Sequence, residues 1–338
     1  MRAAAFDSVD NPSAIEIVDR PEPTPERGEA VVRVKAAALN HRDLWKVKDD
    51  RLEEDDLPFV PGADLAGTVV RTGQGVTHVS EGSRVVLCPI STCGTCRFCR
   101  DGPENMCERY SSYDGAFAEQ ARVKADRLVE LPESVDFVTA AALPVSYMTA
   151  FRMFERGDVS AGDLVFVPGV TGGVGVAVVQ LASYLGVETI GTSTSAEKLS
   201  RVEAEGLDHA IRTADAGEMR AAVGSLGDVD VTINHLAGPY TDVGTKVLGR
   251  DGVMVVCGRT AGRMSEFDAQ DLYFGHKRIL GSTLGTQPDL EKLVGLVENG
   301  QLDPLVDRTY PLAETARAFE EMDSRDVVGK LVVRPQER

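Results

Sequence analysis

Short runs of alternating apolar and polar residues dominate the first third of the chain. Alternation with a period of two predicts half-buried strands, and the clusters of Gly, Pro and Asp between the runs predict turns. The strands expected here lie at residues 15–18, 30–34, 68–70 and 84–87. Many short strands joined by close turns indicate an antiparallel barrel or sandwich.

The pattern changes at about residue 139, beyond which apolar strands alternate with helical segments. The strands expected in this part lie at residues 164–167, 188–190, 230–233 and 253–256, and the helices at about 139–156, 174–185 and through 199–202. Strands that alternate with helices predict a parallel, doubly wound sheet, so the fold class is α/β. The last stretch predicts two more helices, at 290–298 and about 313–322, and a strand at 330–333.

Length and charge narrow the possible functions. A chain of 338 residues predicts about two domains. The net charge of -17 argues against a nucleic-acid partner, because the phosphate backbone would be repelled. No run of 18 apolar residues is present, so we expect no membrane span, and the strand-like residues 1–6 leave no room for a secretory leader. We therefore expect a cytoplasmic protein.

The basic residues are 27 Arg and only 9 Lys, and acidic runs occupy residues 49–50 and 53–56. One interpretation is adaptation to a very salty cytoplasm, where screening removes the repulsion within an acidic surface. The other is an ordinary acidic protein from a genome that favours Arg. Composition alone leaves both open.

Four cysteines with the spacing C-x2-C-x2-C-x7-C, namely Cys93, Cys96, Cys99 and Cys107, are the most informative local feature. Four thiolates on one short segment can close a tetrahedral shell around Zn²⁺, and a closed shell has a structural role. Disulfides are disfavoured by the clustering and the missing leader. An iron–sulfur cluster is the stronger alternative, although its fourth cysteine comes sooner and precedes proline. The other two cysteines, Cys88 and Cys257, lie in apolar runs and are expected in the core.

A glycine-rich turn follows the strand at 164–167 and opens a helix. Its residues expected to bind a cofactor are Gly169, Gly172, Gly173, Val174 and Gly175. Glycines allow backbone N–H groups to approach a pyrophosphate, whose charge the helix N-terminus favours. The strand–turn–helix context makes this a dinucleotide-binding prediction rather than a plain turn.

The second strand of such a unit sets the preference between NAD and NADP. An NAD site places Asp or Glu at the end of this strand to bind the ribose 2′-hydroxyl. Here the stretch contains Thr192 and Ser193, whose small hydroxyl groups leave room for a 2′-phosphate, and Lys198 and Arg201 add positive charge. We expect NADP(H), with NAD(H) as the alternative.

Taken together, these motifs resemble the medium-chain dehydrogenases/reductases, the superfamily of zinc alcohol dehydrogenases and quinone oxidoreductases. The matching motifs are AALNHRD at 37–43, PGADLAG at 61–67, the cysteine cluster, AALP at 141–144, YMTA at 147–150, GGVG at 172–175 and GST at 281–283. The resemblance implies a GroES-like catalytic domain formed by residues 1–138 and 286–338, which carries a zinc lobe at about 88–110. It also implies a Rossmann domain at 139–285, homodimers or homotetramers, and cofactor contacts at Gly258 and Ser282.

The chain departs from the zinc alcohol dehydrogenases at the catalytic metal. Those enzymes have zinc ligands where this chain has Asn40, Ala63 and Leu143 or Pro144, whereas Asp64 matches a nearby acidic residue of the family. Amide, methyl and apolar side chains do not hold Zn²⁺. The resemblance therefore implies an enzyme with structural zinc and without catalytic zinc.

Without a metal to polarise a carbonyl, the expected substrates are already electrophilic, such as quinones and conjugated enones. The expected catalytic residues are Asn40, as a donor to developing oxyanion charge, and His41, as a proton relay near neutral pH. Asp43 and Tyr147 are further candidates. Each also has a structural interpretation: Asn40 ends a strand, His41 and Asp43 pair with each other or with backbone, and Tyr147 belongs to the core.

Three other functions stay open. A zinc-dependent alcohol or polyol dehydrogenase would recruit atypical ligands from His41, Asp43, Asp64 and Cys88. A nucleotide-binding protein would hold NADPH without turnover. A zinc-ribbon nucleic-acid module is remote because of the acidic charge.

Overall fold

The computed structural model describes residues 1–8, 14–48 and 52–337, so the acidic pair at residues 49–50 lies outside the described residues. The chain divides into two compact units. The first contains Met1–Val145, Thr286–Gly300 and Pro304–Arg338, and the second contains Ser146–Gly285 and Gln301–Asp303. The division falls after Val145, within the long helical segment that the sequence analysis assigns wholly to the second domain.

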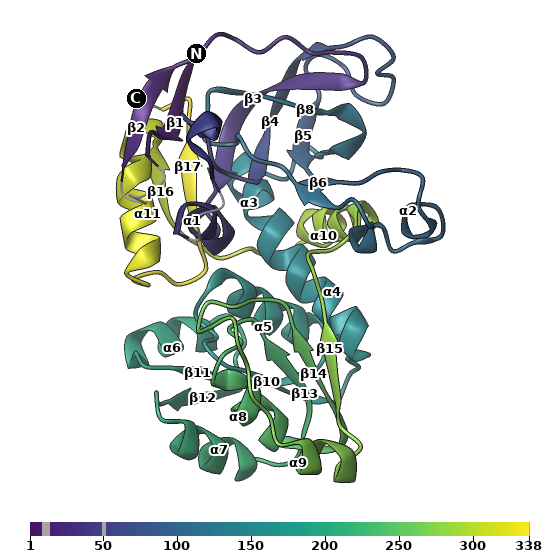
Figure 1. Ribbon diagram of the computed structural model, residues 1–338, viewed down its shortest axis with the longest axis vertical. Coiled ribbons are helices and arrows are strands. Elements are labelled where there is room, and N and C mark those ends of the chain that lie inside the picture. The colour runs from purple at the N-terminus through teal and green to yellow at the C-terminus, as the bar shows by residue number, and fades with distance from the viewer. Residues whose placement is uncertain (9–13, 49–51, 338) are drawn as a thin grey trace. The chain divides into compact units, whose positions relative to one another are not determined.

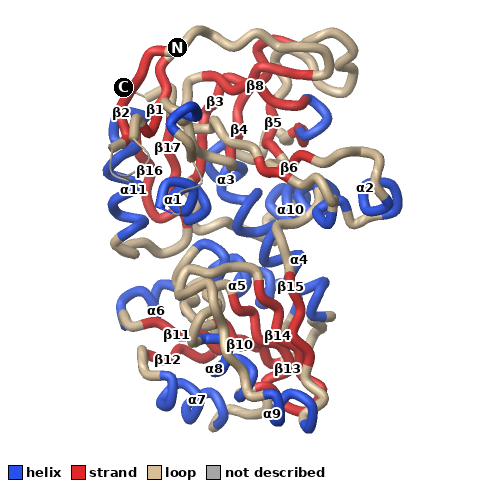
Figure 2. Tube along the Cα trace, in the orientation of Figure 1, coloured by secondary structure: helices blue, strands red, loops and turns tan. Residues whose placement is uncertain are grey.

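A seven-stranded mixed sheet forms the framework of the first unit (Figures 1 and 2). Its order is β16 (Val306–Pro311), β17 (Lys330–Arg334), β3 (Glu29–Ala38), β4 (Asp64–Thr72), β5 (Arg84–Leu87) and β9 (Leu128–Glu130), and β8 (Gln120–Lys124) also pairs with β3. Most neighbours are antiparallel, as the alternating pattern predicts, whereas β16 and β17 run parallel. Two small antiparallel pairs complete the strands: β1 (Arg2–Phe6) with β2 (Ile15–Asp19), and β6 (Ile90–Ser91) with β7 (Ser111–Ser112).

The register of this sheet brings three strand ends together. The last residue of β3, Ala38, pairs with Asp64, the first residue of β4, and with Val332 of β17. Because β17 begins at Lys330, its first side chain lies near the place where β3 ends and β4 begins. Residues that are far apart in the sequence therefore meet at one end of the sheet.

Short helices surround this sheet: α1 (His41–Lys48), α2 (Arg97–Asp101), α3 (Phe137–Ala142), α10 (Gln287–Glu298) and α11 (Thr315–Asp323). The core of the unit includes Phe319 of α11, which makes edge-to-face contacts with Phe6 at 5.7 Å and Phe117 at 5.6 Å between ring centroids. Such aromatic pairs add stabilisation beyond their buried area.

The second unit is built on a six-stranded parallel sheet (Figure 1). The strand order is β12 (His209–Arg212), β11 (Glu188–Ser193), β10 (Leu164–Val167), β13 (Val229–Asn234), β14 (Leu248–Val256) and β15 (Arg278–Gly281). Numbered within the unit, this is the order 3-2-1-4-5-6 of doubly wound dinucleotide-binding sheets. The predicted α/β fold class is confirmed.

α4 (Met148–Gly157) precedes the first of these strands. The helices between the strands are α5 (Gly173–Leu185), α6 (Ala196–Glu203), α7 (Ala216–Gly224), α8 (Tyr240–Lys246) and α9 (Ala269–Phe274). α5 is buried along most of its length, which explains its nearly unbroken apolar sequence. It begins at Gly173, one residue before the expected start, with Gly172 as the residue before its first turn.

Within the part of the chain that the structure describes, one helical segment is apolar enough to cross a membrane by length and composition. It spans Phe137–Gly157 and joins α3, a π-helical turn at Leu143–Tyr147, and α4. However, 67% of its most apolar window is buried inside the protein. That degree of burial is typical of a core helix.

Candidate active site and metal centre

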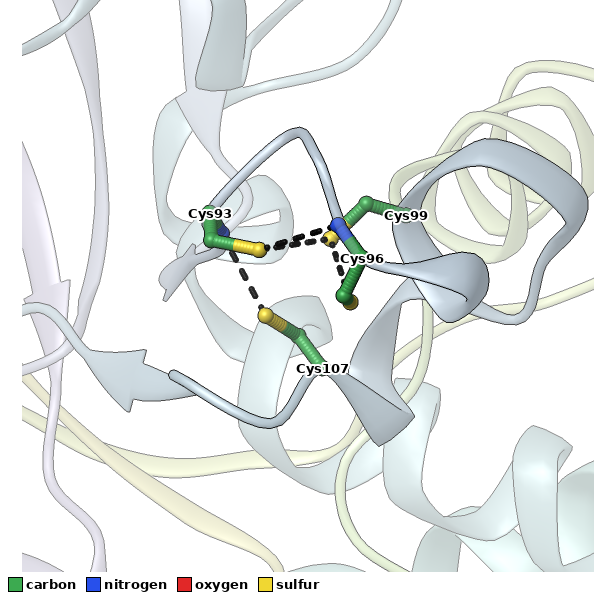
Figure 3. Close-up of side chains that lie close together, drawn as sticks. All are labelled: Cys93, Cys96, Cys99 and Cys107. Carbon is green, nitrogen blue, oxygen red and sulfur yellow. Dashed lines mark hydrogen bonds between the residues drawn. The ribbon is translucent and has the colours of Figure 1, made fainter.

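The four cysteines of the predicted zinc site converge in the first unit, as Figure 3 shows. The segment that carries them leaves β6, passes through α2 and a 3₁₀ turn at Glu104–Met106, and returns along β7. Gly94 and Gly102 adopt positive φ, which glycine tolerates at such tight turns. The β6–β7 pairing holds the two ends of the segment together, so the cysteines lie on a loop with fixed ends.

The sulfur positions fit one tetrahedral ion. All four ligand atoms lie within 4.8 Å of one another, and Cys99 Sγ lies 3.8 Å from Cys93 Sγ and 3.5 Å from Cys96 Sγ. A tetrahedral site with Zn–S bonds of about 2.3 Å places sulfurs about 3.8 Å apart. Backbone N–H groups also point at the sulfurs: Cys96 N donates to Cys93 Sγ, and Arg109 N donates to Cys107 Sγ, both at 3.3 Å. The residues therefore fit structural zinc.

Local hydrogen bonds already favour thiolates at part of this cluster. Donation from Thr95 and from backbone N–H groups lowers the pKa of Cys93 to about 5. Backbone hydrogen bonds from Glu108 and Cys99 lower the pKa of Cys96. Removal from water and the neighbouring thiols raise the pKa of Cys99 to about 11. A divalent cation would favour the loss of this proton, because it stabilises the thiolate.

The zinc lobe is tied to the rest of its unit by Glu104. Its carboxylate accepts from Arg127 Nη1 at 2.7 Å and from the backbone N–H of Gln287, the first residue of α10, at 3.1 Å. Cys107 follows Glu104 by three residues. An ion bound to Cys107 would therefore also restrain the contacts of Glu104 with Arg127 and Gln287. Outside the lobe, Cys88 is fully buried and Cys257 is half-buried, and burial raises the pKa of both thiols to about 12.

The glycine turn of the second unit has the close approach that a pyrophosphate requires. A Cβ on Gly175 would lie 2.3 Å from the carbonyl oxygen of Val170, so no other residue fits there without a shift. Gly169 has a φ of +66°, and its N–H donates to Thr192 Oγ1 at 3.2 Å. Gly172, the N-cap residue of α5, has no side chain with which to cap the helix, so the N–H groups of the turn that carries Gly173 and Val174 suit an anionic ligand. The residues fit a dinucleotide.

The strand end that selects the ribose substituent carries hydroxyl groups and no carboxylate. β11 ends at Ser193, whose Oγ accepts from Ser195 N, and Ser195 in turn caps α6 through the N–H of Lys198. Thr192 is buried and serves the glycine turn instead. Arg212 is not among the residues expected at this site. It ends the neighbouring strand β12, pairs in register with Ser193 and is exposed. Only the strand register reveals this proximity.

The two remaining cofactor candidates lie after the next strands of the same sheet. Gly258 follows β14, and a Cβ there would lie 2.0 Å from the carbonyl oxygen of His235. Ser282 follows β15, and its Oγ is buried and has no hydrogen-bond partner among the described residues. A buried hydroxyl that lacks a partner is suited to meet a ligand.

Three of the four expected catalytic residues lie together in the first unit. Asn40 follows β3, and His41 and Asp43 belong to the first turn of α1. Asp43 is fully buried; it accepts from Asn40 N at 3.0 Å and from Arg42 Nη1 at 2.9 Å, so it holds the start of α1. Its burial raises the pKa of its carboxyl group to about 6. This is the structural role left open for Asp43 by the sequence.

The amide of Asn40 is already engaged inside the protein. Its Nδ2 donates to Asp64 Oδ2 at 2.9 Å and to Ala38 O at 3.4 Å, and its Oδ1 accepts from Lys330 Nζ at 2.6 Å. An amide has two N–H donors, so donation to a substrate oxyanion must use the weakly held one facing Ala38. Lys330 is not among the residues expected at this site; the signal for it in the sequence is a lysine directly before the apolar run Leu331–Val333.

His41 is half-buried next to this group. Burial, with the positive charges of Lys330, Arg325 and Lys48 opposed by Asp323, lowers the pKa of His41 to about 4. The imidazole is therefore neutral at neutral pH. The environment of His41 does not favour the expected proton relay by a group that titrates near neutral pH. A neutral imidazole can still donate or accept one hydrogen bond at each ring nitrogen.

The fourth candidate, Tyr147, lies in the second unit. It is buried, and its hydroxyl donates to Gln180 Oε1 at 2.7 Å. The environment of Tyr147 is therefore that of a core residue.

Among the described residues, only the cysteine cluster brings three or more His, Cys, Asp or Glu ligand atoms within reach of one ion. The atypical set of His41, Asp43, Asp64 and Cys88 does not converge in this way. The carboxylates of Asp43 and Asp64 accept hydrogen bonds from protein donors instead.

Two protein-family models match the chain. Residues 26–133 match the alcohol dehydrogenase GroES-like domain, and residues 173–299 match the zinc-binding dehydrogenase model. The first match lies inside the expected GroES-like part, whereas the second begins in the expected Rossmann part and extends 14 residues beyond its expected end at residue 285.

Individual relatives cover nearly the whole chain. An acryloyl-coenzyme A reductase of Metallosphaera sedula is 30% identical over 329 residues, which is 94% of this chain and 96% of the relative. A quinone oxidoreductase of Rattus norvegicus is 28% identical and covers 92% of this chain and 90% of its own. The crystal structure of an NAD-dependent alcohol dehydrogenase superimposes with a TM-score of 0.91 at 32% identity and covers 99% of both chains.

Removing one thiolate should empty the metal centre. We expect Cys93→Ser to lower the zinc content from about one ion per subunit to nearly none, and to lower Tm by more than about 5 °C, because binding of structural zinc contributes directly to folding. Metal analysis and thermal unfolding measure both. Cys88→Ala is the matched control, since Cys88 is a buried cysteine outside the cluster; equal zinc loss in both variants would contradict the assignment.

A side chain at Gly175 should block the dinucleotide. We expect Gly175→Val to weaken NADPH binding at least about tenfold, because its Cβ collides with the Val170 carbonyl and displaces the turn. Fluorescence titration of NADPH gives the affinity. Gly295→Ala is the control, because a Cβ there meets no atom within 4 Å. Unchanged affinity in Gly175→Val would remove the turn from the binding site.

The depressed pKa of His41 predicts a pH effect on stability. The unfolded imidazole takes up a proton near its ordinary value of 6.5, whereas the folded one does so only near 4, so stability rises with pH across this window. We expect His41→Gln to flatten that rise in urea unfolding measured from about pH 4 to about pH 7. Half-buried His209, paired with Glu188, gives the control variant His209→Gln. If the slopes of wild type and His41→Gln agree, the depressed pKa is wrong.

Proposed function

Since the chain belongs to the medium-chain dehydrogenase/reductase superfamily, we propose that it is an NADP(H)-dependent oxidoreductase whose acceptor is already activated. The proposed substrates are small molecules: quinones, or carbonyl compounds conjugated to a double bond. Structural zinc in the cysteine cluster, and no catalytic zinc, completes the proposal.

The observation that supports this proposal most is the environment of Asn40. Asn40 occupies the position at which the zinc alcohol dehydrogenases have a metal ligand. Its amide oxygen accepts a hydrogen bond from Lys330, and its amide nitrogen donates one to Asp64. Alcohols and simple aldehydes gain most from a metal that polarises their oxygen. Conjugated acceptors carry an electron-poor carbon of their own, so they suit a site of this kind.

The substrates of two relatives agree with this substrate class. Acryloyl-coenzyme A reductase acts on a conjugated thioester and quinone oxidoreductase on a quinone, both of which are activated acceptors. For this chain we favour the conjugated acceptor, since the acryloyl-coenzyme A reductase covers slightly more of both chains.

The cofactor preference rests on the edge formed by β11 and β12. Ser193, Lys198 and the exposed Arg212 offer donors and positive charge to a 2′-phosphate, and no carboxylate ends β11 to repel it. When bound, the reduced nicotinamide supplies the hydride that adds to the electron-poor carbon of the acceptor. The similar alcohol dehydrogenase structure is NAD-dependent, so NAD(H) is the alternative to be tested.

The chain's own side chains would orient the acceptor and handle its developing negative charge. His41, neutral at the pH of the reaction, can donate one ring N–H to the acceptor oxygen or pass a proton through a hydrogen bond. The weakly held N–H of Asn40 offers a second donor. Asp43 holds the start of α1 that presents His41, and Tyr147 packs in the second unit.

The zinc-dependent alcohol dehydrogenase remains the second candidate, favoured by the match to the zinc-binding dehydrogenase model. It requires a second metal ion, and among the described residues no group of ligands other than the cysteine cluster converges to bind one. We also propose that the enzyme is a homodimer or homotetramer and that it is located in the cytoplasm.

Turnover across acceptor classes tests the proposal. We expect the protein to oxidise NADPH with quinones and conjugated enones at least about tenfold faster in kcat/KM than with saturated aldehydes, because no metal polarises the latter. A chelator that reaches weakly bound ions should leave these rates unchanged. Fast aldehyde reduction that the chelator abolishes would favour the zinc-dependent alcohol dehydrogenase. Tight NADPH binding without turnover of any acceptor would favour the nucleotide-binding protein.

A further inference from the structure

Lys330 places a buried ammonium group where three strands meet. Its side chain is 3% exposed, and Nζ donates to Leu39 O at 2.7 Å and to Asn40 Oδ1 at 2.6 Å. It also lies 3.4 Å from Asp64 Oδ2, and Asp64 is fully buried. A buried lysine is costly unless every N–H finds an acceptor, and here all three do.

Asp64 extends this pair to a fourth segment of the chain. Its Oδ2 accepts from Asn40 Nδ2, and its Oδ1 accepts from the backbone N–H of Val145 at 3.0 Å. Val145 lies in the π-helical turn after Pro144, where the backbone departs from regular α-helical bonding. One ion pair therefore connects the end of β3, the starts of β4 and β17, and this turn.

We propose that Lys330 is a positioning residue of the active site, which with Asp64 fixes the Asn40 amide in one orientation and anchors the segment that presents His41. The orientation follows from the chemistry of the partners. An ammonium can only donate, so it selects the amide oxygen, and a carboxylate can only accept, so it selects the amide nitrogen. The inference rests on the proposed function, since Asn40 and His41 are its candidate catalytic residues.

The same ammonium also acts on His41 through its charge. The charged groups that influence this imidazole are Lys330 of β17, Arg325 and Asp323 at the end of α11, and Lys48 of α1. Lys330 is the strongest of them and is itself held in place by three acceptors. Removing it should both free the amide and make His41 easier to protonate.

The test compares Lys330→Met and Lys330→Arg with the double variant Asp64→Asn/Lys330→Met. The single Met variant leaves Asp64 buried without its cation, so it is expected to lose stability; the double variant removes both charges and should regain most of it. We expect kcat for NADPH-dependent enone reduction to fall about 10- to 100-fold in both Met variants, with unchanged NADPH affinity, and Lys330→Arg to retain more activity than either. Lys277→Met is the matched control, because Lys277 is another nearly buried lysine, held by Asp271 and Thr245 O in the second unit.

Two readouts need no turnover. In NMR spectra of the substrate-free protein, the His41 pKa should rise in the folded double variant, and the side-chain NH₂ signals of Asn40 should move. These signals decide the inference even if wild type reduces no acceptor, which would defeat only the proposed function. Recovery of both stability and kcat in the double variant, or signals of His41 and Asn40 identical to those of wild type, would overturn the inference.

Discussion

The ion pair between Lys330 and Asp64 is the interaction on which the candidate active site depends. Charges buried this deeply are tolerated only when hydrogen bonds satisfy them, and this pair is satisfied by a side-chain amide, a backbone carbonyl and a backbone N–H. The strand register makes the meeting possible, because β3 ends where β4 and β17 begin. The chemistry available at Asn40 and His41 is therefore set by the sheet beneath them.

The zinc lobe shows the opposite arrangement, in which all ligands come from one short segment. Its sulfurs, turns and backbone N–H groups are local, and Glu104 is its link to Arg127 and to the first residue of α10. Among the described residues, no second group of ligands converges near Asn40. Under the proposed function, the metal therefore serves structure and electrophilic activation is left to the substrate. This division of roles connects the metal centre to the proposed preference for conjugated acceptors.

Much of this was readable from the sequence. Alternating and helical patterns predict the larger strands and helices because their apolar faces are long, and the cysteine spacing and the strand–turn–helix context identify local sites. Short elements such as α1 and β12 escape, since eight residues rich in charge or four half-exposed ones carry little pattern. What the sequence could not provide is contact between distant residues: Lys330 on Asn40 and Arg212 beside Ser193 follow only from strand register. The neutral state of His41 likewise depends on its burial and on the positive charge of Lys330 from β17.

Anomalous X-ray diffraction at the zinc absorption edge, on crystals grown with added zinc, tests the central claim most directly. We predict one strong peak per subunit, surrounded by Cys93, Cys96, Cys99 and Cys107, with Lys330 Nζ in contact with Asn40 and no metal density beside it. A second peak at ligand distance, about 2.0–2.2 Å, from Asp64 or His41 would contradict the account.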